Sequence, residues 1–250
     1  MNVLTAKYEI LDKEKINGKE ILQKIETIGR TCYKSEDRIT EDSSERFVKN
    51  LILRGHEAML EFFDITVKFY CDRGISHELV RHRVSSFAQE STRYCNYAAD
   101  KFGNEVTFID IRRGLELDSK TKNIDEFTIK AIISEWLESC YDAEKHYLSM
   151  LELGASPQIA RSVLNNSTKT EINVKMNLRE WRHFFNLRCD IAAHPQMREL
   201  TVPLLRDMYE ICPVVFEDIV EWVEFMEFTE KKDAAKSHEK CTEYKLKPAD

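Results

Sequence analysis

The chain has 250 residues, of which 42% are hydrophobic and 32% are charged. Acidic side chains outnumber basic ones, 44 against 37, which gives a net charge of −7. This is the composition of a soluble globular protein that can bury a sizeable core. An acidic balance argues against a general nucleic-acid binder, which normally carries a basic footprint.

The sequence predicts neither a membrane span nor a secretory signal. No apolar run approaches the roughly 20 residues that a membrane helix requires. Residues 1–18 lack a basic start followed by an apolar core. The seven cysteines form no C-x-x-C pair, which favours reduced, buried thiols over a disulfide framework or a zinc site. We therefore expect a cytoplasmic protein without a metal centre.

The N-terminal part of the chain predicts three helices and two strands. Apolar side chains at helical spacing mark residues 17–30, and a second helix is expected over residues 43–55. Residues 62–71 alternate apolar and polar side chains, the period of a half-buried strand. A short helix over residues 76–83 and a second strand over residues 104–111 follow.

The C-terminal part of the chain predicts mainly helices. A long helix over residues 123–154 precedes another over residues 156–166, which begins at a Ser-Pro pair. Residues 169–177 predict a strand, and helices are expected over residues 178–190 and 194–212.

Local features complete this expected order. Asn177 is placed to cap the helix that follows it, and Pro203 predicts a kink or break. Helices outnumber strands, and the strands look half-buried, so the predicted fold is α+β: an antiparallel or mixed sheet flanked by helices. No repeat or linker divides the chain. We expect a single domain over residues 1–228 and a charged tail over residues 229–250 that frays.

The segment RHRVSSFAQESTRY, residues 81–94, concentrates arginines and hydroxyls in an otherwise acidic chain. Arg81, His82 and Arg83 are consecutive, so their side chains point in different directions and can serve two ligands or two subunits. If the segment turns helically, residues three, four and seven apart share one face: Ser86, Gln89, Glu90 and Arg93. Such groups suit a phosphate and a heteroaromatic ring, although a solvated surface with ion pairs is the alternative.

Two familiar site motifs are absent from the sequence. There is no G-x-G-x-x-G and no G-x-x-x-x-G-K-[ST], so any phosphates must be held in another way, for which arginine forks are the obvious means. His77 and His82 imitate a zinc-protease motif but lie five residues apart. On a helix they point about 140° apart and cannot share a metal on one face.

The 81–94 segment resembles the signature of flavin-dependent thymidylate synthases, which is R-H-R-x-x-S followed by a further arginine. The matching residues are Arg81, His82, Arg83, Ser86 and Arg93, with Ser91 and Tyr94 also in family places. The segments around His56 (RGHEAMLEF) and Arg161 (ARSVLNN) resemble the family as well, as do NLREWRHFFNLRCD and AHPQMREL. The resemblance covers about residues 32–216.

This resemblance implies a homotetramer that makes dTMP from dUMP, with active sites between subunits. Methylenetetrahydrofolate would give the carbon, and NADPH would give the reducing equivalents through FAD. The resemblance places these residues at the flavin: His56, Arg81, His82, Arg83, Gln89, Asn177, Arg179 and His183. It places these at the nucleotide: Glu78, Arg81, Gln89, Glu90, Ser91, Thr92, Arg93, Arg161 and Arg188. Arg188 matches the arginine that favours ionisation at N3 of the uracil, and is the predicted catalytic residue.

Some positions differ from the common family pattern or leave their roles open. The differences put individual ligand contacts in doubt: Phe62, Glu78 and Gln89. Ser91 is expected to hydrogen-bond a phosphate or sugar, because no base that would make it a nucleophile is identifiable. Cys95 and Cys189 are expected to pack rather than react.

Two other functions compete with this interpretation. One is an RNA- or nucleotide-binding module that would use three arginines and three aromatic residues: Arg81, Arg83, Arg93, Phe87, Tyr94 and Tyr97. The other is a phosphatase or nucleotide hydrolase, for which the sequence offers neither a metal cluster nor an activated nucleophile. A yellow purified protein would separate the flavoenzyme from both.

Overall fold

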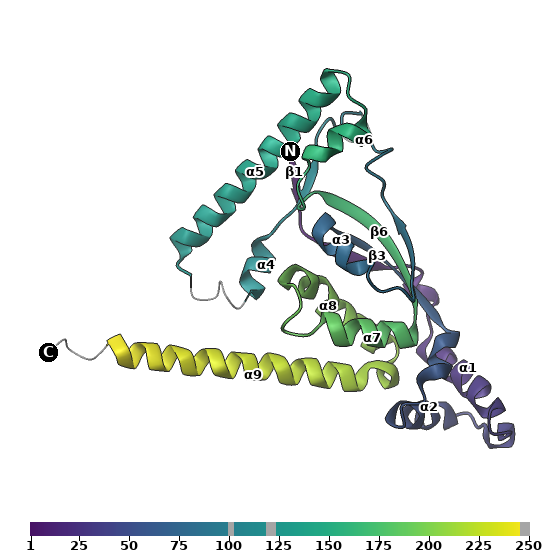
Figure 1. Cartoon of the computed structure of the whole chain (residues 1–250). Helices are drawn as coiled ribbons and strands as arrows, with labels where there is room; N and C mark the ends of the chain where they lie inside the picture. The colour runs from purple at the N-terminus through teal and green to yellow at the C-terminus, as the bar shows by residue number, and fades with distance from the viewer. Residues whose placement is uncertain (100–102, 119–123, 246–250) are drawn as a thin grey trace.

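The computed structural model describes residues 1–99, 103–118 and 124–245, with residues 230–245 as backbone alone. Helices surround a central sheet, while α5 and α9 extend along two edges of the molecule (Figure 1). The strands are β1 (Asn2–Leu4), β2 (Lys7–Ile10), β3 (Asp64–Asp72), β4 (Ser86–Gln89), β5 (Thr107–Ile109) and β6 (Lys169–Asn177). The helices are α1 (Gly18–Thr31), α2 (Ser43–Leu53), α3 (Arg73–Leu79), α4 (Arg112–Leu117), α5 (Glu126–Glu152), α6 (Pro157–Ala160), α7 (Leu178–Arg188), α8 (Pro195–Ile211) and α9 (Pro213–Lys245).

The main sheet has the strand order β2-β3-β6-β4, and every neighbouring pair is antiparallel. Its centre is the long ladder between β3 and β6, which runs from Asp64 opposite Asn177 to Asp72 opposite Lys169. Alternate residues of both strands are buried. For β3, this agrees with the alternation of apolar and polar side chains in residues 62–71. β1 and β5 form a separate parallel pair. The predicted α+β fold, a helix-flanked antiparallel sheet in a single domain, is confirmed.

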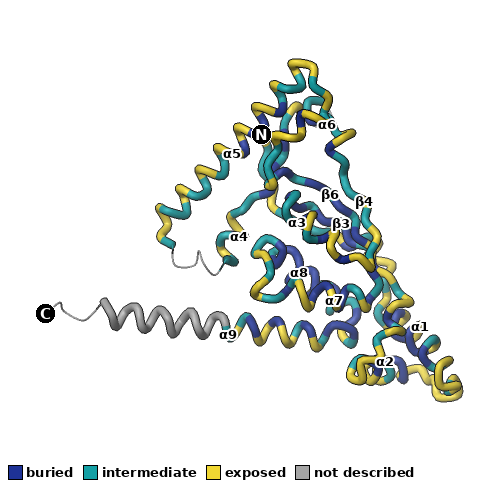
Figure 2. Tube along the Cα trace, viewed as in Figure 1, coloured by how far each residue is buried: buried dark blue, intermediate teal, exposed yellow. Residues whose placement is uncertain are grey.

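The core lies between the sheet and the helices that cover it. Burial is concentrated in β3, β6, α7 and α8, whereas α5 and α2 are exposed over much of their length (Figure 2). Leu178, Trp181, Phe184 and Phe185 of α7 are fully buried, and the Trp181 indole N–H donates to the Ile65 carbonyl at 3.1 Å. These anchors fix α7 against the sheet, which leaves its polar side free to line a cavity.

Several expected boundaries moved. The helix α9 continues through Thr229 to Lys245, so its end does not coincide with the expected start of a frayed tail. Pro203 lies inside α8, which continues to Ile211. The first residue of the helix expected over 123–154 and the last five residues of the chain lie outside the described residues.

The expected helical face of the 81–94 segment is wrong. Residues 86–89 form β4, which pairs with β6, so their side chains alternate between two faces instead of sharing one. An alternating run of only four residues gave too weak a pattern to predict this strand. Among the described helices, none is long and apolar enough to cross a membrane.

Candidate active site

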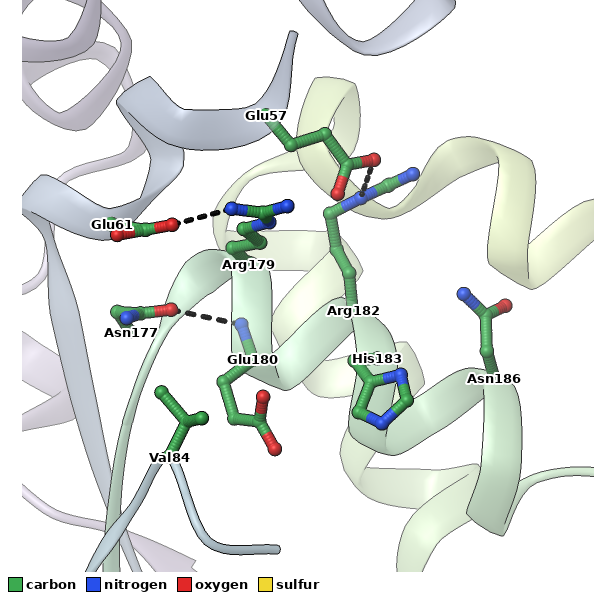
Figure 3. Close-up of a pocket in the computed structure, with 9 residues that line it drawn as sticks. All are labelled: Glu57, Glu61, Val84, Asn177, Arg179, Glu180, Arg182, His183 and Asn186. Atoms are coloured by element: carbon green, nitrogen blue, oxygen red, sulfur yellow. Dashed lines mark hydrogen bonds and ion pairs between the residues drawn. The ribbon is translucent and has the colours of Figure 1, made fainter. Parts of the chain in front are cut away.

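The helix α7 carries most of the polar residues that line a cavity of about 440 Å³. The strand β6 ends at Asn177, whose side-chain oxygen accepts the Glu180 backbone N–H at 2.9 Å and so caps the helix. Arg179, Glu180 and His183 follow at two, three and six residues from the cap, and their side chains line the cavity (Figure 3). We call this space the α7 cavity. Three predicted flavin contacts, Asn177, Arg179 and His183, therefore meet in one place.

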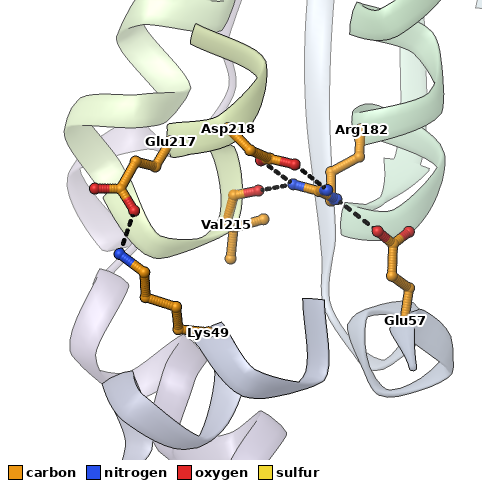
Figure 4. A network of polar contacts seen from close by, with 6 residues as sticks. All are labelled: Lys49, Glu57, Arg182, Val215, Glu217 and Asp218. Carbon is orange, nitrogen blue, oxygen red and sulfur yellow. Dashed lines mark hydrogen bonds and ion pairs between the residues drawn. The ribbon is translucent and has the colours of Figure 1, made fainter. Parts of the chain in front are cut away.

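The arginines of the α7 cavity are already paired with carboxylates. The Arg179 guanidinium donates to Glu61 at 2.6 Å (Figure 3). Arg182, which is only 5% exposed, donates to Glu57 at 3.1 Å and to both carboxylate oxygens of Asp218 at 2.7 and 2.8 Å (Figure 4). Arg182 thus ties α7 to α9 and to the 3-10 helix Glu57–Phe62. Its role here is to position the cavity wall.

Arg188 ends α7, and neighbouring groups hold its guanidinium on three sides. It donates through Nη1 to the Glu78 carboxylate at 2.7 Å, through Nη2 to the Glu78 carbonyl at 3.2 Å, and through Nε to His82 Nε2 at 3.0 Å. Of the five N–H donors of a guanidinium, one on each terminal nitrogen remains. These unused N–H groups are available as donors to a ligand.

His82 is buried and neutral. Burial, the Arg188 charge and His183 together lower the pKa of His82 to about 4. Because Arg188 donates to Nε2, the ring proton belongs on Nδ1, which lies 3.5 Å from the Glu180 carboxylate. His82 therefore accepts from Arg188 without adding a second positive charge.

The ligand atoms of His82, Glu180 and His183 lie within 4.8 Å of one another, which is close enough for a metal ion. The hydrogen bonding disfavours that use. The Nε2 lone pair of His82 is taken by Arg188, and the fixed Arg188 charge would repel a cation. The sequence had suggested no metal, on the separate ground that His77 and His82 diverge.

A second cavity of about 390 Å³ contains two predicted nucleotide contacts. Arg161 donates to the Thr92 hydroxyl at 2.9 Å, and both residues line the cavity together with Arg73 and Asn166. The two arginines come from separate elements, α3 and the 3-10 helix Arg161–Val163. They provide guanidinium donors of the kind a phosphate requires.

The remaining predicted residues are not among those that line these two cavities. Arg81 and Arg83 are exposed on either side of the buried His82, as their consecutive positions predicted. Gln89 donates to the hydroxyls of Ser76 and Thr170 at 3.0 and 3.2 Å. Both contacts use the side-chain nitrogen and hold Gln89 against α3 and β6.

The residues after β4 form a local turn. Glu90 accepts from Lys169 at 3.1 Å and from the Tyr97 hydroxyl at 3.2 Å. The Ser91 hydroxyl accepts the Arg93 backbone N–H at 3.3 Å, while the Arg93 guanidinium lies over the Tyr94 ring. Within the described chain, the predicted residues do not share a single cavity.

His56 lies apart from the other predicted flavin contacts. It lines a third cavity between α1 and α2, although the adjacent Glu57 lines the α7 cavity. Sequence reasoning missed the carboxylates that hold the site, Glu57, Glu61 and Glu180. Glu180 was detectable, because it stands three residues from both Asn177 and His183 on one predicted helix face.

Fold and site together define an α+β protein whose cavities are lined by arginines and whose sequence contains no glycine-rich phosphate loop. Residues 16–214 match the family described as thymidylate synthase complementing protein. The chain is 31% identical over 196 residues to a flavin-dependent thymidylate synthase of Geobacter sulfurreducens, covering 76% of this chain and 78% of that protein. It is 33% identical over 184 residues to a flavin-dependent thymidylate synthase of Pyrococcus furiosus, covering 72% of this chain and 68% of that protein.

The chain therefore belongs to the flavin-dependent thymidylate synthase family, as the motifs predicted. A solved structure supports the same fold: a UMP/dUMP methylase, PolB, from Streptomyces cacaoi, bound with 5-Br dUMP. It superposes with a TM-score of 0.71 at 19% identity, covering 87% of this chain and 96% of that one.

Proposed function

We propose that this chain methylates dUMP to dTMP, with methylenetetrahydrofolate as carbon donor and NADPH-reduced FAD as reductant. The observation that carries the proposal is the placement of Arg188. Its guanidinium is held by Glu78 and His82 at the end of α7, the helix that lines the α7 cavity, and keeps one unused N–H donor on each terminal nitrogen.

The residues of the α7 cavity suit a flavin. A volume of about 440 Å³ lies within the usual range for ligand cavities, and Asn177, His183 and Arg179 supply amide, imidazole and guanidinium groups. FAD, when bound, would supply the redox chemistry. The protein's part is to hold and orient the ligands on a rigid helix.

Arg188 activates the uracil in this proposal. Its unused N–H donors and its fixed charge would stabilise negative charge that develops on the uracil. That charge raises electron density at C5, the carbon to be methylated. Glu78 and His82 keep the guanidinium from turning away.

No thiol is needed in this scheme. Cys189 is the cysteine next to Arg188 in the chain, yet it is fully buried, and burial raises the pKa of its thiol to about 12. A thiol of that pKa is almost entirely protonated at neutral pH and is a poor nucleophile.

The test is a purified, full-length protein assayed for both colour and product. We expect flavin absorbance, and dTMP formation that stops when dUMP, methylenetetrahydrofolate or NADPH is omitted. UMP in place of dUMP tests the choice of sugar. A colourless protein that binds RNA, or one that hydrolyses dUMP, would contradict the proposal in favour of a competing function.

We also propose that the active form is a homotetramer. Arg81 and Arg83 are exposed and are not among the residues that line the α7 cavity, so a neighbouring subunit would complete their sites. Light scattering on the active enzyme should give four times the chain mass of 29.4 kDa. A fully active monomer would exclude shared sites.

A further inference from the structure

A basic cavity of about 560 Å³ lies between α1 and α2, away from the predicted nucleotide contacts. We call it the α1–α2 pocket. Five cationic side chains and one carboxylate, Asp37, are among its lining residues, and the cations are Arg30, Lys34, Arg38, Arg46 and Arg54. This excess of positive charge contrasts with the net charge of −7 of the chain.

Most of these cations have no counter-ion among the residues that the structure describes. Within the described part of the chain, the side chains of four of them make no hydrogen bond or ion pair: Lys34, Arg38, Arg46 and Arg54. Arg46 and Arg54 stand eight residues apart, with Asn50 midway, so the spacing of four places all three on one side of α2. Clustered like charges repel one another, so an anionic ligand would relieve an unfavourable arrangement.

The floor of the α1–α2 pocket is already organised. Arg30 donates to Glu26 at 2.8 and 3.1 Å, and the other Glu26 oxygen accepts the Ser43 hydroxyl at 2.7 Å. The Arg30 guanidinium also lies 4.5 Å from the centre of the Phe47 ring. This network joins α1 to α2, so a ligand would meet a preformed surface.

The turn after α1 presents an aromatic ring beside the cations. Tyr33 is 64% exposed and lines the pocket next to Lys34. Lys34 has φ of 47°, the left-handed conformation that lysine rarely adopts, and the Ser35 N–H donates to the Arg30 carbonyl at 3.3 Å across the turn. An exposed ring beside unpaired cations suits a ligand with both an aromatic base and phosphates.

The α1–α2 pocket adjoins the α7 cavity through the backbone. His56 lines the first and Glu57 the second, and consecutive Cα atoms lie about 3.8 Å apart. A long ligand held in the α1–α2 pocket could therefore reach the α7 cavity with its other end.

We propose that the α1–α2 pocket binds the adenosine 2′-phosphate end of NADPH. This proposal rests on the proposed function, in which NADPH is a co-substrate. The 2′-phosphate is the group that distinguishes NADPH from NADH, and arginine is the side chain suited to it. Arg38 and Arg46 take the phosphate, Tyr33 takes the adenine, and the nicotinamide extends toward the α7 cavity.

The first experiment requires no turnover. Adenosine 2′,5′-bisphosphate is titrated by calorimetry against the full-length enzyme, with 5′-AMP as the probe that lacks the 2′-phosphate. Arg38→Gln and Arg46→Gln are compared with Lys19→Gln, a matched loss of one charge on α1 outside the lining residues. We expect each pocket variant to weaken the bisphosphate by roughly 10- to 100-fold, the worth of a charged hydrogen bond, with 5′-AMP and Lys19→Gln unaffected.

The second experiment measures KM for NADPH and for NADH on the same variants, together with FAD content. The proposal predicts a raised KM for NADPH alone, with the FAD content of wild type. Equal binding of the two adenosine probes would overturn it. So would a loss of FAD with an unchanged NADPH to NADH ratio, because the pocket would then hold the flavin phosphates. If wild type oxidises neither nucleotide, the proposed function fails, while the calorimetry still decides the 2′-phosphate site.

Discussion

The α7 cavity and the α1–α2 pocket both contain arginines, but they differ in what those arginines contact. In the α7 cavity, Arg179 and Arg182 are paired with carboxylates of neighbouring elements. In the α1–α2 pocket, Arg38 and Arg46 have no partner among the described residues. A paired arginine fixes the position of backbone elements, whereas an unpaired one keeps its donors for a ligand. Substituting a paired arginine of the α7 cavity should therefore reduce stability, whereas substituting an unpaired arginine of the α1–α2 pocket should reduce ligand binding.

Arg188 is paired with Glu78 and also keeps unused N–H donors for a ligand, so its substitution should have the largest effect. Arg188→Lys keeps the charge but loses the planar fork that can contact two adjacent uracil atoms. We expect dTMP formation to fall about 100- to 1000-fold, the equivalent of about 2.7–4 kcal/mol, while FAD content and NADPH oxidation remain. Both rates are measured on one preparation.

Arg206→Lys is the matched control, because Arg206 forms a surface pair with Glu227 at 3.2 Å. Methylation close to the wild-type rate in Arg188→Lys would show that Arg188 does not activate the uracil. Loss of FAD would instead assign Arg188 to the flavin site or to the fold.

Arg182→Met tests the paired side of the comparison. The change leaves Glu57, Asp218 and the Val215 carbonyl without their donor (Figure 4). Because the Asp218 side chain is 55% exposed and can be rehydrated, we expect a loss of about 3 kcal/mol, the low end for a broken buried pair. Urea unfolding measures it.

Arg46→Gln supplies the contrasting stability measurement. It removes an unpartnered surface charge, so its free energy of unfolding should stay within about 0.5 kcal/mol of wild type. If Arg46→Gln destabilises the protein as much as Arg182→Met does, the distinction between paired and unpaired arginines is wrong.

The sequence predicted the sheet and helices well wherever a pattern was long. The alternation in residues 62–71 and the cap at Asn177 both correspond to the structure, because local spacing determines which side chains face the core. The short strands β1, β2 and β4 were missed. Three or four residues carry too little periodicity, and their pairing partners lie far along the chain.

The candidate site was predicted only in part, for a related reason. Asn177, Arg179 and His183 could be grouped from one helix, whereas the Arg188 contacts to Glu78 and His82 span more than 100 residues. No spacing rule reaches across such a distance. Paired and unpaired arginines also look alike in a sequence. The α1–α2 pocket could therefore be recognised only from the structure, which shows which arginines contact carboxylates.

His82 should make the stability of the protein depend on pH. Its pKa in the folded protein is lowered from the ordinary value near 6.5 to about 4, first by burial and then by Arg188. Between these two values the unfolded chain binds more protons, so stability is complete above about pH 6.5 and falls as the pH drops toward 4. The protonation of His82 lowers the free energy of unfolding by about 3 kcal/mol at most, and this full loss is reached only near pH 4.

Urea unfolding of wild type and His82→Gln across this range measures that contribution. The variant should show a shallower loss of stability between pH 6.5 and 4 than wild type does. Parallel curves would mean that the pKa of His82 is the same in the folded and the unfolded chain.

Cys189→Ala should have the smallest effect on catalysis. The Cys189 side chain is fully buried at the end of α7, and burial raises the pKa of its thiol to about 12. Losing the sulfur from a packed position costs about 1 kcal/mol of stability, as typical substitutions do, without touching a ligand. We therefore expect nearly wild-type dTMP formation, measured below the temperature at which the variant begins to unfold. Cys95→Ala, the cysteine nearest the arginine motif, is assayed beside it. If either variant keeps its fold and FAD but makes no dTMP, a thiol nucleophile operates, and uracil activation by Arg188 alone is insufficient.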